Sequence, residues 1–237
     1  MPGTTVAFLQ IRDDAEERNI EAQSFLRASG LPAADVRFFN VLADEFPEQP
    51  IGEFRALVVG GSPYSVFPPD EPLGLSRMFT LVRIAARIRL PYLGLCFGGQ
   101  LLAQALGGEV IRDEIHQERG SYLLKKEPAA NDDPLFRAMP PVFVAQESHH
   151  DRITKLPPGS VALASSERIS VQAFVITGTP LYGFQCHPER SKADFEFLLL
   201  KRKEDHGKWG KLLAPLQESP EAEALPRVFF DKIAPLT

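Results

Sequence analysis

The stretch LGLCFGGQ runs from Leu93 to Gln100 and joins an apolar strand pattern to a helical pattern. A sharp strand-to-helix turn forces its central residue into a strained conformation, and small flanking residues allow close approach. Here the central residue is Cys96, between Gly94 and Gly98. Such a turn presents its side chain above the carboxyl edge of a parallel sheet, where open α/β folds hold ligands. We therefore predict that Cys96 is a nucleophile, with a thiol pKa lowered by the N-terminus of the following helix.

On both sides of this turn, strand and helix patterns alternate through the first half of the chain. The expected strands are residues 5–11, 36–41, 55–59 and 91–95, and the expected helices are residues 15–29, 75–89 and 98–106. Alternation with short links implies a parallel sheet with helices on both faces. The second half instead shows strand patterns linked by turns, at residues 120–126, 142–146, 161–165, 170–176 and 181–186. We predict an α/β fold with a mostly parallel central sheet flanked by helices, and with an antiparallel extension.

The segment of residues 191–237 is expected to be helical. A helix is predicted from Ala193 to Lys203, and two more helices follow it. We expect residues 1–190 to form one domain and residues 191–237 to form a helical extension of the same domain. Lys201-Arg202-Lys203 is a short basic cluster followed at once by acidic residues, which is typical of a solvated helix face.

Composition excludes several classes of protein. The 237 residues carry a net charge of −5, which disfavours sequence-independent binding to nucleic acid. No apolar run approaches the ~20 residues that a membrane span needs, and the N-terminus lacks the basic flank of a secretory signal. The chain has 2 cysteines, too few for a disulfide framework. We therefore expect a cytoplasmic protein with free thiols, and the oligomeric state stays open.

A glycine-rich loop supplies the second element of a reactive site. Attack on an amide carbonyl creates an oxyanion, which backbone N–H donors stabilise. The N–H of Phe97, at the start of the helix, is one expected donor. The other is expected from Gly60-Gly61, which follows the third strand at the same sheet edge and allows the backbone to approach a ligand closely. We predict an oxyanion hole formed by Gly61 and Phe97, with Gly60 beside the substrate.

The sequence His187-Pro188-Glu189 follows the last predicted strand. Residues two apart on a strand face the same side, so Glu189 can hold the His187 ring. An imidazole oriented by a carboxylate is the base that a thiol nucleophile needs. Cys186 alternates to the opposite face and is expected to pack in the core. We predict a catalytic triad of Cys96, His187 and Glu189.

At these residues the chain resembles the class I (triad) glutamine amidotransferase family, above all the glutaminase half of GMP synthase and its stand-alone relatives. The resemblance rests on residues 94–100, on the His-Pro-Glu sequence, on the Gly60-Gly61 loop, and on Ser148-His149-His150-Asp151, which is similar to a segment that helps to hold the substrate glutamine. These motifs occur in the family's order and span most of residues 5–190. The family's fold is an α/β, flavodoxin-like glutaminase domain, which agrees with the pattern of strands and helices.

The resemblance implies a reaction and several binding residues. Cys96 would attack the δ-carbon of glutamine and form a γ-glutamyl thioester, which water then hydrolyses to glutamate. His187 would move the protons, and ammonia would pass to an acceptor. Gln100 and the backbone of Ser148 and His149 would contact the amino-acid end of the substrate. No cofactor is implied.

Three functional hypotheses remain open from the sequence. About fifty residues follow Glu189, fewer than the ~100 of a typical synthetase domain, and no Walker motif occurs. A glutamine amidotransferase would therefore need a separate synthase or acceptor subunit. The same triad would also serve a stand-alone γ-glutamyl peptidase or hydrolase. A non-catalytic regulatory protein on the same scaffold is the third hypothesis, because fold does not fix function.

A metal site is not expected from the sequence. Histidines 149 and 150 are adjacent, so their side chains point in opposite directions on a strand, and the chain has no His-x-x-x-His or Cys-x-x-Cys spacing.

Overall fold

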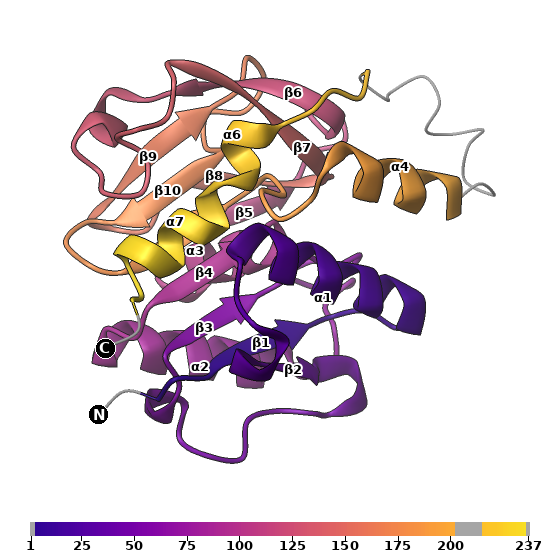
Figure 1. Cartoon of the computed structure of the whole chain (residues 1–237), viewed down its shortest axis with the longest axis vertical. Helices are drawn as coiled ribbons and strands as arrows, with labels where there is room; N and C mark the ends of the chain where they lie inside the picture. The colour runs from indigo at the N-terminus through magenta and orange to yellow at the C-terminus, as the bar shows by residue number, and fades with distance from the viewer. Residues whose placement is uncertain (1–2, 202–214, 236–237) are drawn as a thin grey trace.

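The first half of the chain builds the parallel part of the sheet. The structure is a computed structural model that describes residues 3–201 and 215–235. The parallel strands in these residues are β1 (Val6–Gln10), β2 (Val36–Asn40), β3 (Ala56–Val59), β4 (Tyr92–Leu95) and β11 (Leu181–Phe184). They lie in the order β2-β1-β3-β4-β11, and each neighbouring pair is parallel (Figure 1). The carboxyl ends of these strands therefore lie at one edge of the sheet. Strand β11 contributes to this edge although it comes much later in the chain than β4.

Antiparallel strands continue the same sheet beyond β11. They are β6 (Glu118–Lys126), β7 (Val142–His149), β9 (Ser160–Ser165) and β10 (Ala173–Ile176). Their order from the parallel part is β11-β10-β9-β6-β7, with antiparallel pairing throughout. The predicted α/β fold with a mostly parallel sheet and an antiparallel extension is confirmed.

Two short strands were not predicted. β5 (Glu109–Arg112) and β8 (Asp151–Lys155) pair with each other as a small antiparallel sheet. In addition, β7 continues to His149, whereas the pattern predicted an end at Gln146. Both extra strands are short and each pairs with a segment far away in the sequence, so no local turn signal marks them. The pairing places the residues after His149 beside the carboxyl edge of the sheet.

Helices cover both faces of the sheet. They are α1 (Ala15–Ser29), α2 (Leu75–Ile88), α3 (Phe97–Ala105), α4 (Lys192–Lys201), α6 (Pro220–Glu223) and α7 (Leu225–Lys232). One buried apolar cluster includes Phe25 of α1 and Phe230 of α7, whose ring centroids lie 6.0 Å apart. The other cluster includes Met78 of α2 and Leu101 of α3. The chain therefore builds three layers, with the sheet between two helical layers (Figure 1).

Helix α1 begins and ends at the residues that its sequence signals predict. The Asp14 carboxylate accepts hydrogen bonds from the N–H groups of Glu16 and Glu17, at 2.8 and 2.9 Å. Such a cap satisfies N–H groups that have no partner within the helix. At the other end, Gly30 adopts a left-handed conformation with φ of 69° and closes the helix.

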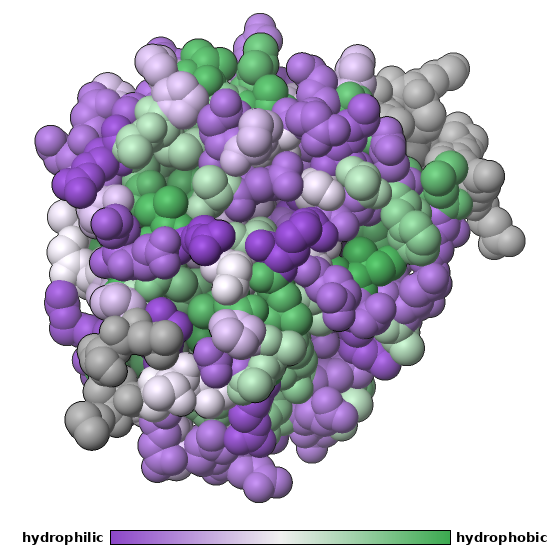
Figure 2. Space-filling view, viewed as in Figure 1, coloured by the Kyte–Doolittle hydropathy of each residue, from purple (hydrophilic) through white to green (hydrophobic). Residues whose placement is uncertain are grey.

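The described part of the C-terminal segment contains the helices α4, α6 and α7, and residues 215–219 before α6 have no regular structure. Helix α4 begins at Lys192 and ends at Lys201, close to the predicted range. Residues 202–214 lie outside the described residues, so the rest of that predicted helix and of the Lys201–Lys203 cluster is not described. Phe197 and Leu200 of α4 are exposed, and Figure 2 shows apolar surface over this part of the molecule, among mostly polar side chains. No helix among the described residues has the length and apolar character to cross a membrane.

Candidate active site

The turn between β4 and α3 holds Cys96 in a strained backbone conformation. Its φ is 51° and its ψ is −102°, a region that residues with a side chain rarely adopt. A Cβ built on Gly94 would lie 2.4 Å from the backbone of Gly98, so only glycine allows the two sides of the turn to come this close. The turn therefore has the geometry of a nucleophile elbow, with Cys96 at its tip.

His187 and Glu189 form a buried pair at the end of β11. The Nδ1 atom of His187 lies 2.8 Å from Oε1 of Glu189, and both side chains are almost completely buried. The guanidinium of Arg190 reaches the same carboxylate oxygen, at 3.4 Å. Since Nδ1 faces a carboxylate, it carries the proton, and Nε2 is left to accept one. This is the base and orienter that the sequence predicts for this pair.

A cavity of about 310 Å³ lies at the carboxyl edge of the sheet. Five of the predicted site residues line it, namely Cys96, Gln100, Ser148, His149 and His187. The other four, Gly60, Gly61, Phe97 and Glu189, are outside this lining, and all of them except Gly60 are next to a lining residue in the sequence. A Cβ on Gly61 would lie 2.7 Å from Cε1 of His187. The cavity thus joins residues of β7 to residues that follow β4 and β11.

Two predicted binding residues are fixed by contacts within the protein. The side-chain amide of Gln100 donates to the backbone carbonyl of Asp151 at 2.9 Å. The backbone carbonyl of Ser148 faces the Cys96 thiol, which donates to it at 3.9 Å. Gln100 therefore ties α3 to β8, and the chain around Ser148 forms the wall beside the nucleophile.

Sequence reasoning missed two arginines of the site, Arg12 and Arg190. Arg12 and Arg190 line the cavity, as do Arg112 and Arg119. Arg12 follows β1 and forms a buried ion pair with Glu21, with Nε 2.9 Å from Oε1. The position of Arg12 just beyond a parallel strand was a signal that could have found it, because ligands bind at that edge. These guanidinium groups give the cavity a polar wall, in which Arg12, Arg112 and Arg190 form ion pairs within the protein.

The thiol of Cys96 is not pre-ionised in this arrangement. Burial, followed by the nearby Glu147 charge, raises the pKa of Cys96 to about 12, although Arg190 and Arg12 oppose the rise. The prediction that the helix N-terminus would lower this pKa was wrong, because burial and Glu147 outweigh it. Cys96 is therefore a neutral thiol at rest and needs a base during attack.

The buried position of His187 has a consequence for stability at low pH. Burial and the neighbouring Arg190 lower the pKa of His187 to about 4, against the opposing effect of Glu189. An imidazole in the unfolded chain has a pKa of about 6.5, so between these values the unfolded chain binds more protons than the folded chain. The free energy of unfolding should therefore fall as the pH drops from about 6.5 towards 4.

Urea unfolding at pH 7 and pH 5 checks this expectation. The wild-type chain should lose more stability over that interval than the variant His187→Gln, which has no imidazole to protonate. Equal losses in the two proteins would mean that His187 titrates normally in the fold.

Comparison with known families agrees with this geometry. A family model described as glutamine amidotransferase class-I matches residues 26–203, which is most of the chain. The chain therefore belongs to the class I glutamine amidotransferase family and is an enzyme of this type. The family resemblance inferred from the sequence is confirmed.

Related proteins include glutamine-hydrolysing subunits of GMP synthase. The chain is 36% identical over 137 residues to such a subunit from Sulfolobus acidocaldarius, covering 58% of this chain and 68% of that one. It is 33% identical over 149 residues to the corresponding protein of Methanocaldococcus jannaschii, covering 63% and 72%. A solved glutamine amidotransferase from Thermotoga maritima has a TM-score of 0.80 at 22% identity, covering 99% of both chains, which shows a shared fold.

Proposed function

We propose that this enzyme hydrolyses the γ-amide of glutamine through a γ-glutamyl thioester on Cys96 and delivers the ammonia to an acceptor. The observation that carries the proposal is that one cavity is lined by both the strained Cys96 and the carboxylate-bound His187. A nucleophile and an oriented base on one cavity wall are the parts that covalent amide hydrolysis requires.

The first half of the reaction forms the thioester. Nε2 of His187 takes the proton of the Cys96 thiol as the sulfur attacks the δ-carbon of glutamine. Glu189 stabilises the imidazolium that forms, because its carboxylate lies against Nδ1. The tetrahedral intermediate then collapses as His187 returns the proton to the amide nitrogen, and ammonia leaves.

The second half restores the enzyme. His187 removes a proton from water, and the resulting hydroxide attacks the thioester carbonyl. The C–S bond breaks, the sulfur recovers the proton through His187, and glutamate is released. The neutral resting state of both Cys96 and His187 supports this scheme, since each proton transfer then occurs only as charge develops on the substrate.

Backbone donors at Gly61 and Phe97 are proposed to stabilise the oxyanion. Phe97 is the first residue of α3, so its N–H has no acceptor within the helix. Within residues 3–201 and 215–235, the N–H groups of Gly61 and Phe97 make no hydrogen bond. Gly60, Gln100, Ser148 and His149 are proposed to border the bound substrate.

The ammonia acceptor is proposed to be held by a separate synthase protein. The support is the similarity to the GMP synthase proteins of two archaea, each of which is named as one subunit of a glutamine-hydrolysing synthase. Cys96 and Cys186 are both free thiols, which suits a reducing compartment such as the cytoplasm.

Residues 191–237 are proposed to be an extension of the glutaminase domain formed by residues 1–190. In the described part of this segment, Phe229 and Phe230 of α7 are buried in the same cluster as Phe8 of β1 and Phe25 of α1. A segment that completes a shared core is expected to fold together with it.

A direct assay tests the proposed reaction. The purified chain is incubated with glutamine, and separately with γ-glutamyl dipeptides and glutathione, and released glutamate is measured. We expect release from glutamine to exceed release from the peptides by at least about tenfold, because a cavity of about 310 Å³ is at the small end for ligand pockets. The Cys96→Ala variant serves as the blank.

The other outcomes each contradict the proposal in a different way. Faster release from the peptides would identify a γ-glutamyl hydrolase. Absence of release from every compound, from a chain that is folded by circular dichroism, would favour a regulatory protein.

A further inference from the structure

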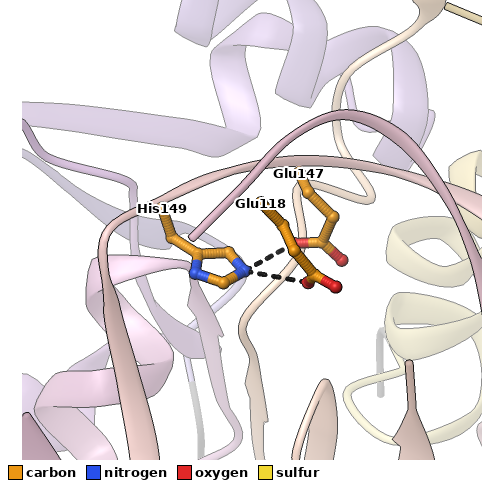
Figure 3. Close-up of side chains that lie close together, drawn as sticks. All are labelled: Glu118, Glu147 and His149. Atoms are coloured by element: carbon orange, nitrogen blue, oxygen red, sulfur yellow. Dashed lines mark hydrogen bonds and ion pairs between the residues drawn. The ribbon is translucent and has the colours of Figure 1, made fainter. Parts of the chain in front are cut away.

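A second cluster of ionisable side chains lies beside the candidate active site, on strands β6 and β7. It consists of Glu118, Glu147 and His149 (Figure 3). Glu118 is the direct cross-strand neighbour of His149, and Glu147 precedes His149 by two residues on the same face of β7. The residue opposite Glu147 is Gly120, which adds no side chain to this face. Strand register therefore brings two carboxylates and one imidazole together.

The three side chains share one small buried space. Glu118 and Glu147 are completely buried, and the His149 side chain is 1% exposed. The Nε2 atom of His149 lies 3.2 Å from Oε2 of Glu118 and 3.4 Å from Oε2 of Glu147. One N–H group faces two carboxylates, as the two dashed lines in Figure 3 show. Even with His149 protonated, two ionised carboxylates would leave a negative charge uncompensated in the cluster.

Glu147 is the member of the cluster that lacks hydrogen bonds. Both of its carboxylate oxygens are buried and make no hydrogen bond within the described residues, where their contact is the 3.4 Å ion pair with His149 that Glu118 shares. One imidazolium shared by two buried carboxylates compensates a single negative charge, and the uncompensated charge costs several kcal/mol, so Glu147 binds a further cation or takes up a proton. Its carboxylate points toward the ring of His149 (Figure 3). The Glu147 carboxylate therefore needs a further partner beside the ring of His149.

We propose that Glu118, Glu147 and His149 bind a divalent transition-metal ion, with Zn²⁺ as the representative ion. The donor set is one imidazole nitrogen and two carboxylate oxygens, which suits Zn²⁺ and its neighbours better than Mg²⁺ or Ca²⁺. In a tetrahedral zinc site with bonds of about 2.1 Å, ligand atoms lie about 3.4 Å apart. The observed distances of 3.2 and 3.4 Å from Nε2 match this separation.

The surrounding residues orient the ligands. Ser166 donates its hydroxyl to Oε1 of Glu118 at 2.6 Å, and the side-chain amide of Gln172 donates to Oε2. Hydrogen bonds of this kind hold a metal-binding carboxylate in one direction. His149 also lines the active-site cavity, so the cluster lies behind the wall of that cavity.

Binding of an ion would change the field at the nucleophile. The Glu147 charge is one of the groups that raise the pKa of Cys96. A divalent cation on Glu147 would offset that charge and make the thiolate easier to form. The bound ion would thus favour the thiolate, which is the reactive form of Cys96. Binding of the ion can be measured directly, without an activity assay.

Zinc loading of the intact chain tests the proposal. The chain is treated with a chelator, dialysed against ZnCl₂ and then against buffer, and its zinc content and zinc-edge X-ray absorption are measured. We expect one zinc per chain, with nitrogen and oxygen neighbours at about 2.0–2.2 Å and no sulfur neighbour at about 2.3 Å. The Cys96→Ala variant should bind the same amount, because the thiol is not a ligand.

Variants distinguish zinc bound at Glu118, Glu147 and His149 from zinc bound elsewhere on the chain. Glu147→Gln should weaken zinc binding by at least about tenfold, whereas Glu109→Gln, at an exposed position on β5, should leave it unchanged. If Glu147→Gln does not fold, Glu118→Gln is used in its place. A sulfur neighbour, or equal binding by the Glu147 and Glu109 variants, would overturn the proposal. Failure to bind zinc would also overturn it and would leave Glu147 as a buried carboxylic acid.

Discussion

Replacing Cys96 by alanine should lower glutamate release from glutamine by roughly 10⁴-fold or more, the range seen when a hydrolase loses its nucleophile. The reason is that the thioester cannot form without the sulfur, and no other thiol of the described residues lines the cavity. The Cys96 side chain is small and lies at the tip of the turn, so alanine should leave the fold intact. The measurement is the initial rate of glutamate release, with circular dichroism to confirm folding.

Cys186→Ala is the matched control for this substitution. Cys186 is 1% exposed and belongs to the apolar cluster that includes Phe184 and Phe136. Its removal should cost about 1 kcal/mol of stability and leave most of the activity, since a small core side chain is lost. Equal loss of activity in the two variants would mean that Cys186 takes part in the reaction.

The elements that the sequence predicts best are those with local signals. Helix α1 has an aspartate cap, a glycine stop and a helical apolar pattern, and its predicted bounds agree with the structure. Strands β5 and β8 carry no such signal, because they are stabilised by pairing with each other across a segment that contains β6 and β7. A strand of four residues with exposed charges, such as β5, cannot be distinguished from a loop by its own pattern.

The candidate site likewise has a part that local sequence signals predict and a part that they do not. The Cys96 turn and the His187-Glu189 pair are each contiguous in the sequence, so local signals find them. The strand alternation expected for His187 and Glu189 is absent, because β11 ends at Phe184 and the two residues meet in a turn closed by a hydrogen bond from the N–H of Arg190 to the carbonyl of His187. Glu118 and Glu147 come together only through the register of β6 against β7, which the sequence does not reveal. The expectation for the thiol pKa failed for this reason, because it included the helix but neither the depth of burial nor Glu147.

Gly98→Ala should lower the stability of the chain by about 3 kcal/mol or more and remove its activity. A Cβ at this position would lie 2.1 Å from the backbone oxygen of Val59, far inside contact distance. Val59 belongs to β3, which is hydrogen-bonded between β1 and β4, so its carbonyl cannot move aside. Helix α3 would have to shift away from the sheet, and such overpacking of a core is strongly destabilising.

The shift of α3 would also displace the nucleophile, because Cys96 immediately precedes this helix. A loss of about 3 kcal/mol corresponds to a fall in Tm of roughly 6–12 °C for a chain of this size, which thermal unfolding can measure. Gly52→Ala is the control, since the Cβ there meets only the flexible end of Ile88 at 3.1 Å and should change Tm little. If Gly98→Ala unfolds at the wild-type temperature and keeps its activity, α3 does not need its close contact with β3. If Gly98→Ala loses stability but keeps its activity, the contact supports the fold but does not position Cys96.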